Sequence, residues 1–223
     1  AELLEVAQSF CRDKSPIPSV RRLIEDELGY DPGVWAEMAR LGWLGIAVPE
    51  EFGGSGLSLA EVVPVVEQMG RRLMGGPFVS TTLAAQALLV GGAEVQKSVI
   101  LPGICAGKAA TLALTEPHGD WDLAHIETSA TETDGKFKLT GVKIFVVDAM
   151  SAEWIIVSVM KNGEPALIII DRASLPENAL RREVVADETR RSFRLQLDGL
   201  IVAADAFLDT ARARETLTHL DLA

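Results

Sequence analysis

The chain has 223 residues, a formal net charge of −11 and 48% hydrophobic residues. This acidic balance argues against a general nucleic-acid binder and against an anionic membrane surface as a partner. No apolar run approaches the ~20 residues that a transmembrane helix needs. The cysteines Cys11 and Cys105 lie far apart and form no CxxC motif. We therefore expect free thiols, no membrane partner and a cytoplasmic location.

The first 108 residues have the apolar periodicity of helices. The stretch "YDPGVWAEMARLGWLGI" predicts a helix with Asp31 as its N-cap, Pro32 in its first position and Gly42 as its stop. The stretch "SLAEVVPVVEQMG" predicts a second helix, because Ser58 and Glu61 have the spacing of a capping box. A proline inside this second helix is expected to kink it.

Two more helices are predicted from "STTLAAQALLVGG", which two glycines close, and from the shorter "EVQKSVILPGICAGK". Between the helical stretches, "EEFGGSGLS" contains Gly53, Gly54 and Gly56. These glycines spell neither GxGxxG nor a P-loop, and they follow no predicted strand. We interpret them as a tight turn between helices rather than as a phosphate cradle.

After residue 108 the apolar period changes from helical to alternating. "ATLALT" predicts one strand, and Asp134-Gly135 and Asn162-Gly163 each predict a hairpin. "SFRLQLDGLIV" alternates like a further strand. Short strands separated by turns are typical of a small barrel or sandwich.

The sequence therefore predicts an α+β fold in three parts. Residues 1–108 form an α-helical domain, residues 109–209 a small antiparallel β-barrel or sandwich, and residues 210–223 the start of a C-terminal helical domain. A frayed terminal helix is the alternative interpretation of the last part.

Motifs of common catalytic sites are missing from the sequence. His118, His125 and His219 look too scattered for a zinc site, and neither HExxH nor GxSxG occurs. From composition and spacing alone we predict no metal site and no reaction.

Three longer stretches together resemble the acyl-CoA dehydrogenase family. They are "ARLGWLGIAVPEEFGGSGLS" at 39–58, "LALTEPHGDWD" at 112–122 and "LTGVKIFVVDAMSAEWIIV" at 139–157. The second is similar to the family pattern ALTEPxxGSD and the third to LxGxKxWITNA…ADxxxV. Their order and spacing match the family, and the resemblance extends over nearly the whole chain.

The resemblance implies a helical domain, a β-domain and a C-terminal four-helix domain, of which the last is expected to be missing here. It implies FAD as cofactor, an acyl-CoA substrate that is desaturated between its α and β carbons, and an electron-transfer flavoprotein as the reoxidising partner. It also implies a homo- or hetero-tetramer. In the family the catalytic base is a glutamate of the C-terminal domain, so no catalytic residue is expected in this sequence, and Glu116 belongs to the flavin motif instead.

Matched residue by residue, the resemblance implies a cofactor-binding set of Leu112, Leu114, Thr115, Trp121, Phe145 and Val147. The first three would line the pyrimidine end of the flavin. Thr115 offers both a hydroxyl and an amide N–H, which suit flavin acceptors; its alternative role is simply to end a strand.

The sequence departs from the family pattern at this same site. Asp120-Trp121-Asp122 replaces Gly-Ser-Asp, Phe145 replaces a tryptophan that flanks the flavin, and Val147 replaces a threonine whose hydroxyl faces it. Asp120 would place a negative charge near the cofactor's diphosphate. His118 is expected to pair with Asp120 or Asp122 and to be structural.

Two explanations of these departures stay open. The chain either binds FAD through different contacts or is a non-catalytic supporting subunit with a degenerate flavin site. The second case is similar to heteromeric bacterial members of the family that act on steroid side-chain thioesters. A different flavoenzyme on the same fold, such as an acyl-CoA oxidase or a nitroalkane oxidase-like protein, is a further alternative.

Overall fold

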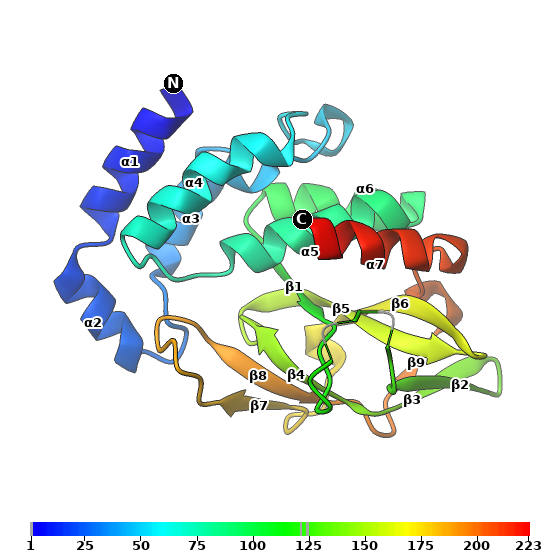
Figure 1. The fold of residues 1–223 in the computed structure, drawn as a ribbon. Coiled ribbons are helices and arrows are strands. Elements are labelled where there is room, and N and C mark those ends of the chain that lie inside the picture. The colour runs from blue at the N-terminus through cyan, green and yellow to red at the C-terminus, as the bar shows by residue number, and fades with distance from the viewer. Residues whose placement is uncertain (1, 121, 124) are drawn as a thin grey trace.

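A computed structural model describes residues 2–120, 122–123 and 125–223. In Figure 1 the helices lie on one side of the molecule and the strands on the other, with β1 running from the helices into the β region. The helices are α1 (Glu2–Lys14), α2 (Ile17–Glu25), α3 (Pro32–Arg40), α4 (Leu59–Arg71), α5 (Phe78–Gly91), α6 (Glu94–Cys105) and α7 (Ala213–Leu222).

The strands form two sheets. They are β1 (Ala109–Ala113), β2 (Ser129–Thr133), β3 (Lys136–Thr140), β4 (Val142–Val147), β5 (Ala152–Lys161), β6 (Glu164–Asp171), β7 (Leu180–Glu183), β8 (Ser192–Gln196) and β9 (Ile201–Val202). One sheet has the order β1-β5-β2-β3-β9, with β6 on the other edge of β5, and the second has the order β4-β8-β7. The predicted α+β fold is confirmed, with one correction to the sheet type. β1 and β2 run parallel to β5, and the described strands form two open sheets rather than a closed barrel.

The predicted local signals are present where helices and hairpins begin. The Asp31 carboxylate accepts hydrogen bonds from the first amides of α3, and Ser58 and Glu61 form the capping box of α4. Asp134 and Asn162 both have positive φ, of 51° and 53°, as the first residues of two-residue turns that lead into β3 and β6. These turns join neighbouring strands in the way that the Asp-Gly and Asn-Gly pairs predict.

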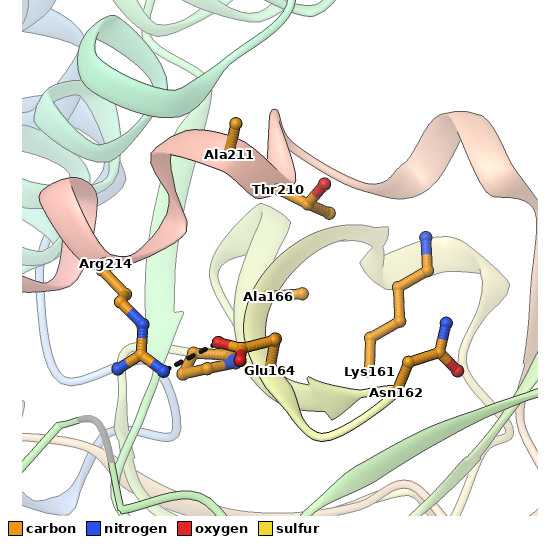
Figure 2. Close-up of a pocket in the computed structure, with 8 residues that line it drawn as sticks. Lys161, Asn162, Glu164, Ala166, Thr210, Ala211 and Arg214 are labelled. Carbon is orange, nitrogen blue, oxygen red and sulfur yellow. Dashed lines mark hydrogen bonds and ion pairs between the residues drawn. The ribbon is translucent and has the colours of Figure 1, made fainter.

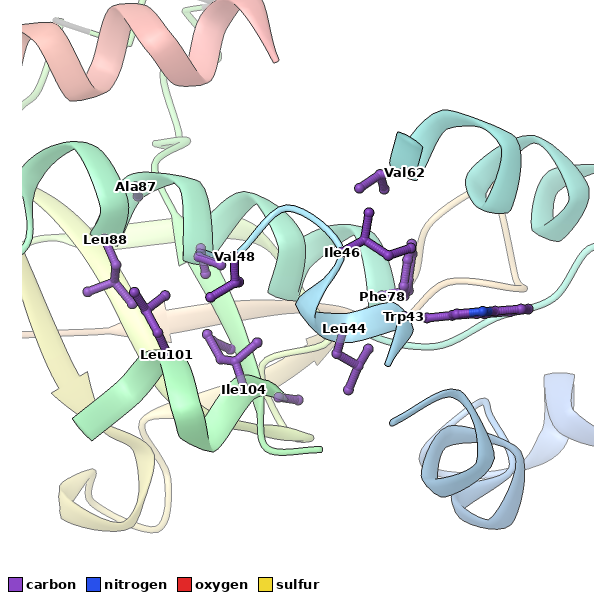
Figure 3. Packing of buried hydrophobic residues seen from close by; sticks show 14 of the residues in the cluster. Trp43, Leu44, Ile46, Val48, Val62, Phe78, Ala87, Leu88, Leu101 and Ile104 are labelled. Carbon is purple, nitrogen blue, oxygen red and sulfur yellow. The ribbon is translucent and has the colours of Figure 1, made fainter. Parts of the chain in front are cut away.

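The core of the helical region surrounds α5, which is apolar on every side. Figure 3 shows side chains from the segment before α4, from α5 and from α6 packed together, among them Leu44, Val48, Leu88, Leu101 and Ile104. All five are at most 5% exposed. A helix that is apolar all round needs cover on several sides, which explains why α5 packs against α6, α7 and β1.

The glycine-rich segment after residue 50 is a compact turn, as predicted. Gly53 has a φ of 84°, and the amides of Ser55 and Gly56 donate to the carbonyls of Gly45 and Val48. Gly54 is pressed so closely on the chain that a Cβ there would lie 2.0 Å from the Val48 carbonyl oxygen. Gly54 therefore serves close backbone packing, whereas Gly53 serves the left-handed backbone of the turn.

Several contacts join the helical and β regions. The indole N–H of Trp35 donates to the Gly107 carbonyl at 2.7 Å. The buried guanidinium of Arg191 donates to the carbonyls of Leu23, Ile24 and Asp26 at 2.6–2.9 Å, so it caps the end of α2. The apolar cluster around α5 also includes side chains of β1, β5, β6 and α7.

The predicted domain boundaries near residues 108 and 209 stay predictions. Within the described ranges, no helix is long and apolar enough to cross a membrane.

Candidate functional site

The end of β1 and the bulged strand β4 meet at one corner. Leu112 lies on β1, and Leu114 and Thr115 follow it, all three partly buried. The Thr115 carbonyl accepts from the Ile144 amide at 2.9 Å, and the Thr111 hydroxyl donates to the Val147 carbonyl at 2.6 Å. The Thr115 hydroxyl forms no hydrogen bond with any residue that the structure describes. It is therefore available to a ligand.

Phe145 is held in an unusual position at this corner. Its φ is 52°, in the left-handed region, and its side chain is 55% exposed. The pairing of β4 with β8 is interrupted between Lys143 and Val146, and the Phe145 amide donates instead to a Glu183 carboxylate oxygen at 3.0 Å. A positive φ at a bulky residue costs energy, and such strain is concentrated at functional sites. The bulge thus presents an aromatic ring to the outside.

The remaining predicted residues differ in how well they are placed. Val147 ends β4 and is partly buried, and its carbonyl accepts from Thr111 of β1, so its backbone lies at the same corner. Trp121 lies outside the described residues. The contribution of Glu183 was missed, because β7 reads "LRRE" and has no alternating apolar pattern.

A buried ion pair lies directly beneath the corner. Lys143 Nζ donates to a Glu116 carboxylate oxygen at 2.6 Å and to the Ser158 hydroxyl at 2.8 Å; the two charged side chains are 0% and 2% exposed. The Glu116 carboxylate also accepts from the amides of Glu127 and Thr128. Glu116 therefore fastens both ends of the loop between β1 and β2 to β4.

Burial and pairing act in opposite directions on these two groups. Burial lowers the pKa of Lys143 to about 8, although Glu116 opposes the shift. Burial alone would raise the pKa of Glu116, but the hydrogen bonds from Lys143, Thr128 and Glu127 lower it to about 2. Both groups are therefore charged at neutral pH, and each depends on the other.

The loop that follows Glu116 brings two histidines together. The rings of His118 and His125 stack with centroids 4.6 Å apart, so the expectation that the histidines are scattered is wrong for this pair. His125 Nδ1 lies 2.7 Å from an Asp120 carboxylate oxygen. His118 Nδ1 accepts from the Asp120 amide, and its Nε2 lies 3.3 Å from Glu116. The Asp120 charge is thus paired by His125 rather than by His118.

An apolar groove opens between α4 and α5 and has a volume of about 330 Å³. Its lining is mostly branched and apolar: Leu59, Val62, Val63, Val66, Glu67, Val79, Thr82, Leu83 and Ala223. Its carboxylate, Glu67, is paired with Arg71 at 2.7 Å. This volume and lining suit a small apolar group.

A more polar hollow of about 470 Å³ lies between the β5–β6 turn and the start of α7 (Figure 2). Arg214 and Glu164 form an ion pair at 2.7 Å on one side of it. Lys161 projects on the other side, with its ammonium over the rings of Phe137 and Phe207 at 4.6 and 4.1 Å. The Arg214–Glu164 ion pair ties the first turn of α7 to the β region, and Lys161 contacts Phe207 in the segment before α7.

Asp148, which directly follows β4, is a buried carboxylate. It is 4% exposed, accepts from the Ser80 hydroxyl at 3.1 Å and lies 3.5 Å from an Arg190 nitrogen. Burial raises its pKa, although Arg190 and Ser80 oppose the shift. A raised folded-state pKa means that its contribution to stability is complete in acid and is lost as pH rises through that pKa.

We expect Asp148→Asn to remove this pH-dependent loss. The amide keeps an acceptor for Ser80 but carries no charge to desolvate, so the variant should gain stability relative to the native chain as pH rises from 4 to 7. Urea unfolding at several pH values measures the difference. Asp134→Asn, at an exposed turn, is the control; a constant difference for Asp148→Asn across this range would contradict the prediction.

Comparisons with known proteins agree with this fold. Residues 1–108 match the family model described as "Acyl-CoA dehydrogenase, N-terminal domain". Acyl-CoA dehydrogenase FadE12 of Mycobacterium tuberculosis is 30% identical over 190 residues, which are 78% of this chain and 47% of that protein. The chain spans about half the length of the curated relatives it matches.

Solved structures extend the similarity into the β region. A structure named "Tcur3481-Tcur3483 steroid ACAD" is 28% identical with a TM-score of 0.87, over 98% of this chain and 59% of that one. An acyl-CoA dehydrogenase of Bacillus anthracis complexed with FAD has the same fold, with 23% identity and a TM-score of 0.83 over 98% of this chain and 39% of that one. This chain belongs to the acyl-CoA dehydrogenase family.

The corner fits part of a flavin but not every contact of the family pattern. The free Thr115 hydroxyl and the exposed Phe145 ring are a donor and a stacking surface of the kind that an isoalloxazine needs. Val147 has no donor to offer. Asp120 is engaged by His125, which offsets the negative charge near the expected diphosphate. The fit is therefore good for the ring system.

Proposed function

We propose that this chain holds the isoalloxazine ring of FAD between β1 and β4 and is part of an enzyme that desaturates acyl-CoA thioesters. The observation that carries the proposal is Phe145, whose exposed ring is held beside Thr115 by a strained backbone and by Glu183. FAD, when bound, supplies the acceptor for the hydride removed from the substrate. In this proposal Thr115 donates to the pyrimidine edge, Leu112 and Leu114 line it, and Phe145 covers the ring.

We also propose that the groove between α4 and α5 takes the acyl group of the thioester. Its side chains are branched and apolar, and its single acid is already paired with an arginine. Burying an alkyl group there gains about 0.8 kcal/mol for each CH₂. No described residue is proposed as the catalytic base.

One observation favours a second candidate, a supporting subunit that completes the flavin site of a partner chain. Val147 has no hydroxyl where the family has one, and the missing hydrogen bond is worth about 0.5–1.5 kcal/mol. The ChsE4-ChsE5 complex of Mycobacterium tuberculosis, which has the same fold, is consistent with this assignment. A tetramer and an electron-transfer flavoprotein as electron acceptor are proposed partners in either case.

The test is a titration of FAD with the purified chain, followed by quenching of flavin fluorescence. The native chain should bind FAD, and Phe145→Ala should weaken binding by roughly three- to tenfold, because the ring loses its stacking partner. Val147→Thr should strengthen binding by roughly two- to tenfold, because it restores a donor. Ile201→Ala, an exposed apolar change on β9, should leave binding unchanged.

Equal affinities of Phe145→Ala and Ile201→Ala would show that the corner is not the flavin site. The two candidate functions are separated by expressing the whole gene product alone and together with its genomic neighbour. Yellow protein from the gene product alone supports an enzyme subunit with its own FAD. Colourless protein that becomes yellow with the neighbour supports the supporting subunit, and colourless protein in both preparations contradicts both candidates.

A further inference from the structure

We propose that His118, His125 and Glu127 form a zinc site on the loop between β1 and β2. One potential ligand atom from each of the three side chains lies within 4.8 Å of the others. The two imidazole rings are stacked, with their centroids 4.6 Å apart and their planes inclined by 19°. Six residues separate the histidines, so this site has no short sequence signature, and the loop brings its ligands together.

Neighbouring groups already position two of the three ligands. His125 Nδ1 lies 2.7 Å from an Asp120 carboxylate oxygen, so an Nδ1–H bond to Asp120 leaves Nε2 free to bind an ion. A carboxylate behind a ligating histidine is a common support in metal sites. The Glu127 backbone N–H donates a hydrogen bond to the buried Glu116 carboxylate at 2.7 Å, which holds the backbone in place. The Glu127 side chain itself is exposed.

Binding requires a modest rearrangement of the rings. Two stacked imidazoles hold their lone pairs in two nearly parallel planes, so the rings have to rotate about their Cβ–Cγ bonds before both point at one ion. His118 would release the Asp120 amide and the Glu116 carboxylate that it now contacts. Zinc bonds of about 2.0–2.2 Å place ligand atoms closer together than 4.8 Å, so the loop also has to tighten. His125 is half exposed and Glu127 is exposed, which leaves room for these two to move, whereas the His118 side chain is 19% exposed and moves least.

The donor set selects the class of ion. Two imidazole nitrogens and one carboxylate oxygen suit Zn²⁺, whereas Mg²⁺ and Ca²⁺ prefer oxygen ligands alone. Three protein ligands leave a fourth position for water. The Asp120 carboxylate adds negative charge close to the site. Because the loop directly follows Thr115, a bound ion would fix the chain beside the corner at the end of β1.

The test is a zinc titration of the full chain. The chain carries no histidine tag and is first dialysed against a chelator. Competition with a fluorescent zinc indicator measures the affinity. We expect one Zn²⁺ per chain. His118→Gln, His125→Gln and Glu127→Gln should each weaken binding at least tenfold. His219→Gln, which changes a histidine of α7, should not alter it, and Mg²⁺ should not compete. Co²⁺ in place of Zn²⁺ should give the visible absorption of a four-coordinate ion.

The thermal midpoint of each variant in excess chelator shows whether it is folded. A midpoint within a few degrees of the native value means that lost zinc binding comes from lost ligands. If a glutamine variant is unfolded, the alanine variant at the same position, judged by the same midpoint, replaces it. Absence of stoichiometric zinc binding by the native chain would overturn the proposal, as would binding that persists in a folded chain without His118 and His125.

Discussion

Replacing Lys143 by methionine is expected to destabilise the fold by about 3–5 kcal/mol, the usual cost of removing one partner from a buried ion pair. Methionine fills a similar volume, so the loss comes from the Glu116 carboxylate, which is 2% exposed and would keep its charge without its cation. Stabilities of folded domains are about 5–15 kcal/mol, so this change removes a large part of the total. Urea unfolding measures it.

Two companion variants test the cause. Lys138→Met, on the exposed side of β3, should change stability by less than about 0.5 kcal/mol. Adding Glu116→Gln to Lys143→Met removes the unpaired charge and should recover part of the loss, which a double-mutant cycle reports as a coupling energy. If the double variant is no more stable than Lys143→Met alone, then the buried charge is not the source of the effect.

Gly54→Ala is expected to cost about 3 kcal/mol or more, at or beyond the upper end of overpacking penalties. The new Cβ would lie 2.0 Å from the Val48 carbonyl oxygen and 2.5 Å from its carbon. Both atoms belong to the Val48 backbone, whose carbonyl accepts a hydrogen bond from the Gly56 amide. Val48 therefore cannot make room by rotating a side chain. Thermal and urea unfolding of the variant measure the cost.

Two other glycines of the chain provide matched controls. Gly53 has a φ of 84° but open space around a new Cβ, so Gly53→Ala should cost only the left-handed penalty of about 1–2 kcal/mol. Gly70 lies inside α4 with open space, so Gly70→Ala should stabilise the fold by about 0.5–1 kcal/mol. A cost at Gly54 no larger than that at Gly53 would contradict close packing as its role.

The elements with local signals were predictable from the sequence, and those without such signals were not. The capping box at Ser58 and the turns at Asp134 and Asn162 depend on residues next to each other, so their chemistry can be read directly. The parallel pairing of β1 with β5 depends on residues about forty positions apart and has no local signature. β7 is short and polar, so it has no alternating apolar pattern, and it was not predicted.

The candidate site was predicted only in part. The motif that contains Thr115 and Phe145 identified two neighbouring elements, but the bulge, the positive φ of Phe145 and its bond to Glu183 come from tertiary structure. The stacking of His118 on His125 was not predicted, because a loop whose ends are tied together by Glu116 brings separated residues into contact. The roles proposed for the flavin-site residues stay predictions.

The cap that Arg191 places on α2 has a consequence for the order of folding. The guanidinium bonds the Leu23 carbonyl across 168 residues of sequence, so during synthesis the last turn of α2 emerges long before its partner exists. Contacts of such long range form late, because the intervening chain must first be ordered. We expect α2 to acquire hydrogen-exchange protection together with β8, although α2 leaves the ribosome long before β8.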